Sequence, residues 1–238
     1  MSAAHSSRAH SCRALLLGRV AYGESDLVVT LLTEPLGRVS ALARGARRSS
    51  KRFAGALEPM HTLRVSLDER PRADLAVLRE AALDRPRSKL VADLESLQAA
   101  GKALSWLRRA TPPRTPEPEA WDAALRFLDL LDRDPGRQQE RLVTFGMQLL
   151  EAFGWGLDLG RCVRCGKVCP PEQTALVNPE RGGLVCRSCG GGPLRLESGL
   201  RHALLLAAQG HEDTIPGADL PRALELVERA LSAHMGFD

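Results

Sequence analysis

The sequence predicts an α+β protein of several domains, in which a five-stranded closed β-barrel precedes an all-α domain with an inserted cysteine-rich module. Three observations carry this prediction. Short runs rich in Val, Leu and Thr fill the first third of the chain. Apolar residues recur at steps of three and four after Pro86, and two C-x-x-C pairs stand between residues 160 and 192.

The composition indicates a globular protein. The chain has 238 residues, of which 44% are hydrophobic and 26% charged, as in an ordinary globular protein. It has no apolar run long enough to span a membrane. The first dozen residues are small and polar without an apolar core, so we expect a disordered tail over 1–12, no export signal and a cytoplasmic protein.

Positive charge is concentrated at the N-terminal end. The net charge is only +4, yet residues 1–53 hold nine Arg or Lys against three acidic residues. A basic end on a near-neutral body indicates either a polyanionic partner or nothing beyond solubility.

Five strands are expected in the first part of the chain, separated by clusters of Gly, Pro, Asp or Ser. Five strands in about 70 residues, with hardly a helix between them, suggest a small barrel. The OB-fold is the commonest barrel of that size and frequently binds nucleic acids. An SH3-like barrel would give a similar pattern, and the Leu-rich runs would also suit a buried helix. The expected strands are 13–20, 26–33, 38–43, 60–67 and 73–80.

Amphipathic helices are expected after Pro86. The first carries apolar residues from Leu90 to Leu107 and stops at the proline-rich segment 111–118. Others run over 118–132, from Leu142 to Phe153, over 198–209, and from an N-cap at Asp219. The domain boundaries expected from this pattern are 13–82 for the barrel, 83–159 and 193–238 for the two parts of the helical domain, and 160–192 for the insert.

The insert contains two copies of one knuckle, each a C-x-x-C pair followed at once by glycine. Twenty residues separate the pairs, which are Cys162 with Cys165 and Cys186 with Cys189. Glycine accepts the positive φ that a sharp turn after the second cysteine needs. Four thiolates about 2.3 Å from one ion form a closed Zn²⁺ site that supports structure and leaves no position open for chemistry.

Other interpretations of the cysteines are a disulfide or a redox C-x-x-C. No secretory feature indicates an oxidising compartment, and neither pair follows a strand in a βαβ unit. Cys169 would replace a knuckle cysteine or remain a spare thiol, and the doubled pattern favours the spare thiol because it already fills the tetrahedron.

A basic loop is expected between the third and fourth strands. Its cations are Arg44, Arg47, Arg48, Lys51 and Arg52, with no acidic residue among them. Such a loop is suited to DNA phosphates, to which arginine adds bidentate contacts. The alternative is a solvated basic loop without a partner. Residues 13–82 contain only Tyr22 and Phe53 as aromatics, so binding through the backbone, with weak sequence selectivity, is expected.

Several segments, taken in order, resemble the RecO family of bacterial recombination mediators. They are Tyr22-Gly23-Glu24-Ser25-Asp26, Thr33, Gly37-Arg38, Gly45-Ala46-Arg47-Arg48, Arg52-Phe53, Leu57-Glu58-Pro59, Leu157-Asp158-Leu159 and Gly182-Gly183-Leu184. The ordered combination is specific, although no single segment is, and it extends from about residue 13 to 235.

The resemblance implies an N-terminal OB-fold, a helical domain with a zinc module, and a non-enzymatic role in DNA repair. It also implies binding of single- and double-stranded DNA, strand annealing, partnership with the single-strand-binding protein SSB and with RecR, and help in loading the RecA recombinase at the nucleoid. The five cations of the basic loop would contact DNA.

Catalytic motifs are absent from the sequence. There is no G-x-S-x-G and no H-E-x-x-H, and Gly166-Lys167 lacks the rest of a phosphate-binding loop. The competing hypotheses are a zinc metalloenzyme, in which a loose fourth ligand leaves the ion an open position, and a zinc-ribbon protein that binds RNA or acts in transcription.

Overall fold

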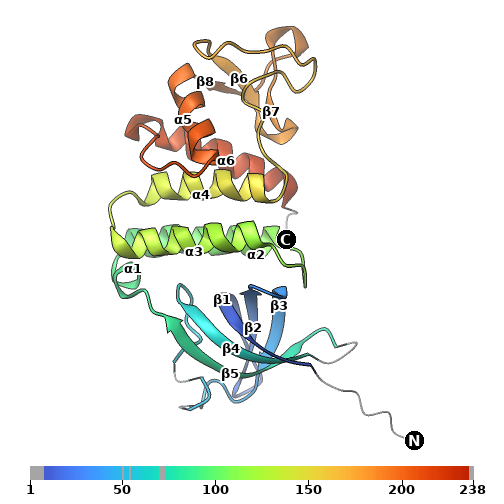
Figure 1. Ribbon diagram of the computed structural model, residues 1–238, viewed down its shortest axis with the longest axis vertical. Coiled ribbons are helices and arrows are strands. Elements are labelled where there is room, and N and C mark those ends of the chain that lie inside the picture. The colour runs from blue at the N-terminus through green and yellow to red at the C-terminus, as the bar shows by residue number, and fades with distance from the viewer. Residues whose placement is uncertain (1–7, 50, 54, 70–72, 236–238) are drawn as a thin grey trace, which may run out of the picture.

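The computed structural model describes residues 8–49, 51–53, 55–69 and 73–235. Its barrel and helices are stacked along the long axis of the molecule (Figure 1). The barrel lies at one end, helices fill the middle, and the cysteine module lies at the opposite end, as Figure 1 shows. Among the residues described, no helix is both long and apolar enough to cross a membrane.

The predicted five-stranded barrel is confirmed, and it is closed in the order β1-β2-β3-β5-β4. Closure depends on the length of β1, whose first half pairs with β4 and whose second half pairs with β2. A short parallel contact between β3 and β5 completes the ring. The strands are β1 Arg8–Tyr22, β2 Asp26–Thr33, β3 Gly37–Ala43, β4 Thr62–Glu69 and β5 Ala76–Arg85.

The first strand starts earlier than the sequence predicts. Residues 8–12 belong to β1 and pair with residues 65–69 of β4, so the expected tail over 1–12 is wrong for them. They are mostly polar, and ladder pairing uses backbone groups, so hydropathy gives no sign of it. The rest of the expected tail, 1–7, lies outside the described residues. The last strand likewise continues to Arg85, beyond the expected end of the barrel at residue 82.

The two faces of the barrel wall have different neighbours. Side chains alternate across a strand, so Ala14 and Leu16 point into the barrel while Leu15 and Leu17 point outward. Leu15, Leu17 and Leu32 are buried in the same apolar cluster as the helices. The helical domain therefore packs against part of the outer surface formed by β1 and β2.

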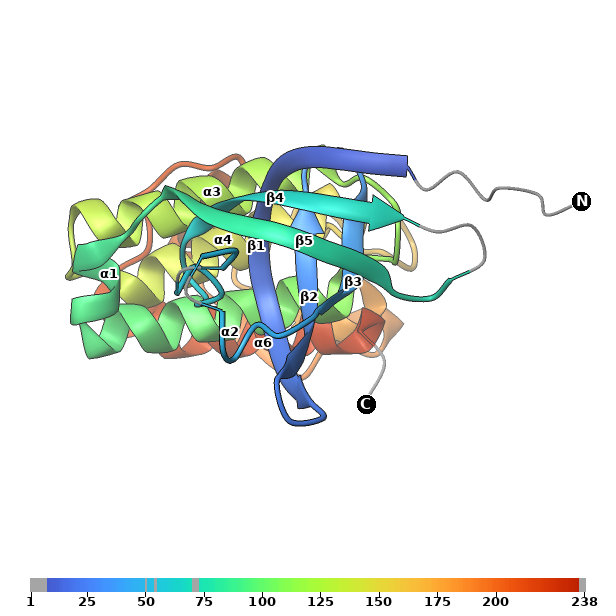
Figure 2. The same cartoon turned by 90° about the horizontal axis from the view of Figure 1, so that it is seen from below.

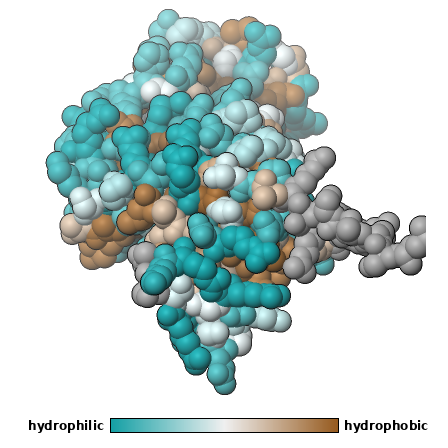
Figure 3. Space-filling view, turned by 60° about the horizontal axis from the view of Figure 1, so that its bottom comes forward, coloured by the Kyte–Doolittle hydropathy of each residue, from teal (hydrophilic) through white to brown (hydrophobic). Residues whose placement is uncertain are grey.

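The turn between β1 and β2 extends beyond the helices. Figure 2, which views the molecule from the barrel end, shows this turn projecting past the edge of the helical layers. The space-filling view in Figure 3 turns the same end forward and shows mainly hydrophilic residues with smaller hydrophobic areas between them.

Within the described residues, six α-helices form the all-α domain. They are α1 Ser88–Ala92, α2 Leu94–Ala110, α3 Pro118–Arg133, α4 Gln138–Ala152, α5 Ser198–Ala208 and α6 Leu220–His234. The single helix expected after Pro86 is split at Asp93, whose extended backbone ends α1. The Asp93 carboxylate accepts a hydrogen bond of 2.8 Å from Ser96 N and so caps α2. The expected N-cap Asp219 does precede α6, but its side chain makes no capping bond.

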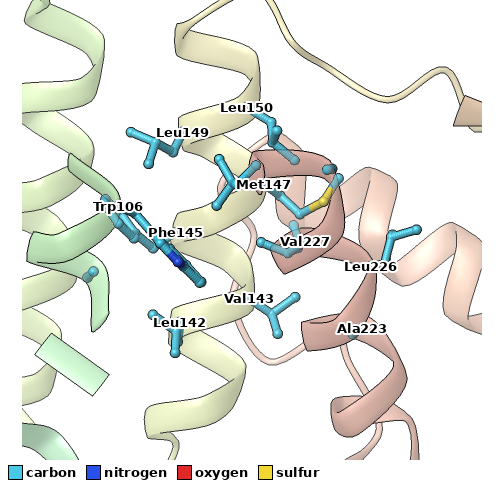
Figure 4. Packing of buried hydrophobic residues seen from close by; sticks show 14 of the residues in the cluster. Trp106, Leu142, Val143, Phe145, Met147, Leu149, Leu150, Ala223, Leu226 and Val227 are labelled. Atoms are coloured by element: carbon cyan, nitrogen blue, oxygen red, sulfur yellow. The ribbon is translucent and has the colours of Figure 1, made fainter. Parts of the chain in front are cut away.

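The helical core is closely packed around α4. Figure 4 shows Trp106 of α2 beside Phe145 of α4, with Leu226 and Val227 of α6 on the other side of α4. Gly146 permits this approach, because a Cβ there would lie 2.3 Å from a methyl carbon of Val227 and 3.1 Å from the Trp106 ring. The helices therefore pack around α4 in one core that lies between the barrel and the cysteine module.

Arg87 joins the barrel to the helices. It is only 1% exposed, and its Nε donates to Asp129 of α3 at 2.9 Å while Nη1 donates to the carbonyl of Met60 at 2.9 Å. Its backbone N–H donates to His61 Nδ1 at 3.0 Å. Burial, with the nearby Arg87 charge, lowers the pKa of His61, which favours the neutral form that accepts this bond.

The cysteine module contains a small antiparallel sheet in the order β7-β6-β8. Its strands are β6 Ala175–Asn178, β7 Gly183–Leu184 and β8 Leu194–Leu196, and the 3-10 turn Pro179–Arg181 follows β6. The sequence predicts the first two strands but not β8, which spans three residues and is too short for a period to be recognised.

Candidate metal centre and nucleic-acid interface

The structure brings the four predicted metal ligands together. The sulfur atoms of Cys162, Cys165, Cys186 and Cys189 all lie within 4.8 Å of one another. The distance between Cys165 Sγ and Cys186 Sγ is 3.7 Å. Four sulfurs at tetrahedral corners about 2.3 Å from a central ion would be about 3.8 Å apart, so the cluster has the size that a Zn²⁺ ion needs.

The glycine after each C-x-x-C takes the predicted left-handed conformation. The φ angle is 72° at Gly166 and 105° at Gly190, where residues with a Cβ are strained. Gly166 N donates to the carbonyl of Cys162 at 2.8 Å, and Gly191 N donates to that of Cys186 at 3.0 Å. These turns direct both sulfurs of a pair toward the same point.

Backbone N–H donors favour the negatively charged thiolate form of Cys162, which is the form that binds a cation. Cys186 N donates to Cys162 Sγ at 3.3 Å, and this bond is the main cause that lowers the pKa of Cys162 to about 6. Hydrogen bonding with Cys186 is the largest cause that raises the pKa of Cys189 to about 12. Cys162 therefore forms a thiolate most readily, and a bound metal would have to displace the proton of Cys189.

Two arginine side chains donate hydrogen bonds to backbone carbonyls of the cysteine module. Arg164, inside the first knuckle, donates from Nη1 to the carbonyl of Cys189 in the second knuckle at 2.8 Å. Arg201 of α5 is buried and donates to the backbone carbonyls of Cys169 and Pro170. Cys169 itself lies outside the four-sulfur group, and its Sγ is 3.9 Å from the carbonyl of Gln173.

The predicted basic loop lies between β3 and β4, against the turn between β1 and β2. Gly45 N donates to the Asp26 carboxylate at 2.7 Å, and Arg47 N donates to the carbonyl of Ser25 at 3.0 Å. Farther along, Ala81 N donates to the carbonyl of Arg52 at 3.0 Å. The loop is thus held to the barrel wall at both ends.

All five cations of the loop are exposed. Arg47 Nη1 donates to the carbonyl of Glu24 at 3.2 Å, and Arg48 lies 3.7 Å from the Glu24 carboxylate. Both partners of this ion pair are largely exposed, so it holds the arginine weakly. Arg52 donates to the carbonyl of Arg44 at 2.7 Å and lies over the Phe53 ring. The loop therefore presents its positive charge to solvent.

Shallow hollows lie on two sides of the loop, and each adds an arginine that the sequence pattern does not single out. One, of about 360 Å³, has Arg19 and Arg47 on its wall. The other, of about 370 Å³, has Lys51, Arg52 and Arg64. Strand alternation places Arg64 on the outer face of β4, but its nearness to the loop depends on closure of the barrel.

Comparison with known proteins follows the division into barrel and helical parts. The family model described as "Recombination protein O N terminal" matches residues 8–92. The one described as "Recombination protein O C terminal" matches residues 91–237. Together these matches cover the barrel, the helices and the cysteine module.

Curated relatives match over nearly the whole chain. A protein named DNA repair protein RecO from Anaeromyxobacter sp. (strain K) is 37% identical over 231 residues, which are 93% of this chain and 90% of the relative. Its namesake from Geobacter sulfurreducens is 32% identical over 227 residues, covering 94% and 92%. The namesake from Myxococcus xanthus is 32% identical over 237 residues, covering 94% and 91%.

Proposed function

The chain belongs to the RecO family of DNA repair proteins, and from this premise we propose that it is a recombination mediator. In this proposal it binds single- and double-stranded DNA, promotes annealing of complementary strands, and helps to load RecA on SSB-coated DNA together with RecR. The observation that carries the DNA-binding step is the exposed basic loop anchored on an OB-type barrel.

DNA would bind through its phosphates. Arg44, Arg47, Arg48, Lys51 and Arg52 supply five cations on one loop, and the neighbouring hollows add Arg19 and Arg64. Arg19 already pairs with Glu58 at 2.7 Å and Arg64 with Asp84 at 2.8 Å. The loop residues are the more available cations, so we assign the main phosphate contacts to them.

The four cysteines would hold a structural Zn²⁺ ion. The sulfurs have the spacing of a tetrahedral site, and four protein ligands would close the coordination shell. A closed shell has no position for a substrate or an activated water, which supports a role without catalysis. The ion would tie the two knuckles together at the end of the molecule opposite the barrel (Figure 1).

SSB, RecR and, indirectly, RecA are the proposed protein partners, and the family of the chain supports them. The helical domain and the cysteine module would offer the docking surface, because the barrel end carries the exposed basic loop. DNA as partner would associate the protein with the nucleoid.

Binding and annealing can be tested with one set of oligonucleotides. We expect the purified protein to bind a fluorescent (dT)20 and a 20-bp duplex with strong salt dependence. It should also accelerate annealing of complementary strands coated with SSB. A matched RNA oligonucleotide separates this proposal from an RNA-binding role, because tighter binding to RNA at equal salt would contradict it.

A further inference from the structure

The outer face of the barrel is only partly covered by the helices. In OB-folds the face formed by strands 2 and 3, with the loop that joins strands 1 and 2, is a common site for oligonucleotides. Here Leu15 and Leu17 of β1 and Leu32 of β2 are buried against the helical domain. The part of β1 and β2 nearest their connecting turn continues beyond them (Figure 2), and residues 19–24 there are exposed.

An irregularity in β1 decides which side chains this open part presents. The pairing of β1 with β2 shifts between Leu16 and Gly18, so that Gly18 lies opposite Thr30. From there Val20 pairs with Val28, and Tyr22 with Asp26. Leu32 lies on the outer face, and alternation places Thr30, Val28 and Asp26 on that face too. Their partners Val20 and Tyr22 therefore also face outward.

These two residues are unusually exposed for their type. Tyr22 is 59% exposed and Val20 is 69% exposed. The other aromatic residue of the barrel, Phe53, is 2% exposed and belongs to the interior cluster. In the described part of the barrel, Tyr22 is thus the aromatic ring that solvent can reach.

Cations lie at both ends of this exposed strip. At Gly18 a Cβ would lie 3.5 Å from Arg108 Nη1, so the guanidinium of this α2 residue sits above the strand. At the other end Arg47 Nη1 donates to the carbonyl of Glu24 at 3.2 Å, which places this guanidinium at the turn that follows Tyr22. Gly18 and Tyr22 are four residues apart, or about 13 Å along a strand. The strip of Val20 and Tyr22 therefore has a cation near each end, and the Asp26 carboxylate opposite Tyr22 accepts a hydrogen bond from Gly45 N at 2.7 Å.

We propose that Tyr22 is a base-stacking residue for single-stranded DNA, with Val20 beside it and the phosphates held by the basic loop and Arg108. The inference rests on the proposed DNA-binding function and adds to it a preference for unpaired bases. Every base has a π-face, so stacking is tolerant of sequence. The bases of a duplex are already stacked on one another, and this residue therefore gains nothing from double-stranded DNA.

The test compares two oligonucleotides of equal charge, (dT)20 and a 20-residue abasic strand. We expect Tyr22→Ala to weaken binding of (dT)20 by about 5- to 150-fold, the range measured for loss of one stacking contact. Binding of the abasic strand and the salt slope on both strands should stay unchanged. Tyr22→Phe should restore binding of (dT)20, because it keeps the ring. Leu83→Ala removes another exposed apolar side chain from β5 and is the matched control.

Three results would overturn the inference. Equal affinity of Tyr22→Ala and wild type for (dT)20 would exclude stacking while leaving the phosphate-binding loop intact. An equal loss on both strands would show a structural role, which the melting temperature of the variant would confirm. Failure of the wild-type protein to bind either strand would contradict the proposed function itself, and this inference with it.

Discussion

Replacing Arg47, Arg48 and Lys51 with alanine removes three of five exposed loop cations. Each phosphate contact on a single strand contributes about −0.7 to the slope of log K against log salt, so the slope should change from about −3.5 to about −1.4. Between 50 and 200 mM salt, wild-type affinity should fall about 130-fold and that of the variant only about 7-fold.

Fluorescence anisotropy of labelled (dT)20 across this salt range measures both slopes. The three side chains are exposed, so the free energy of unfolding should change by no more than about 0.5 kcal/mol. A matched control replaces three exposed cations of the helical domain, Lys89, Arg133 and Arg222, and lowers the net charge equally. Equal slopes in wild type and loop variant, or the same loss in the control, would refute the assignment of phosphate contacts to this loop.

Three further variants test the rest of the structure. Cys162→Ser should release the metal and leave residues 157–196 sensitive to proteases, because metal binding supplies about 10 kcal/mol of folding free energy in such sites; metal analysis and limited proteolysis measure this. Arg87→Ala should lower the free energy of unfolding by about 1–3 kcal/mol in a urea titration, because the carbonyl of Met60 loses its donor while Asp129 keeps only its exposed partner Arg85. His61→Asn should flatten the pH dependence of stability. Burial lowers the pKa of His61 below its ordinary value of 6.5, so wild-type stability is lost as pH falls through and below that value.

Each of these variants has an outcome that contradicts its reasoning. One zinc ion per chain in Cys162→Ser would show that this sulfur is not a ligand. A loss below 1 kcal/mol in Arg87→Ala would mean that the junction does not depend on the buried ion pair. If the stability of the wild-type protein were constant between pH 7 and pH 5, protonation of His61 would not destabilise the fold.

Short-range sequence patterns were sufficient to predict the order of the barrel, the helices and the cysteine module. Alternating apolar residues and turn residues located all five strands, and the spacing of leucines located the helical domain. The doubled C-x-x-C with its glycines predicted the four-sulfur cluster, since both the ligands and the turn residues are local features. The sequence did not predict the polar start of β1 or the three-residue strand β8, because neither has a recognisable pattern of apolar residues.

The proposed DNA-binding surface was predicted less completely, because it depends on contacts between distant residues. The basic loop is a visible run of arginines, whereas Arg108 comes to the barrel from α2, some 90 residues after Gly18. Tyr22 and Phe53 look equivalent in the sequence, yet barrel closure buries Phe53 and leaves Tyr22 exposed. The register shift after Leu16 determines which side chains at the end of β1 point outward, and no residue pattern in the sequence predicts this shift.

We propose that this chain brings DNA strands together on SSB-coated DNA through its basic loop. Fluorescence energy transfer between labelled complementary strands measures their annealing in the presence of SSB and this protein. We expect wild-type protein to accelerate annealing and the triple variant of Arg47, Arg48 and Lys51 to do so far less, while the control variant of Lys89, Arg133 and Arg222 remains active. Equal annealing with and without the wild-type protein would contradict this proposal.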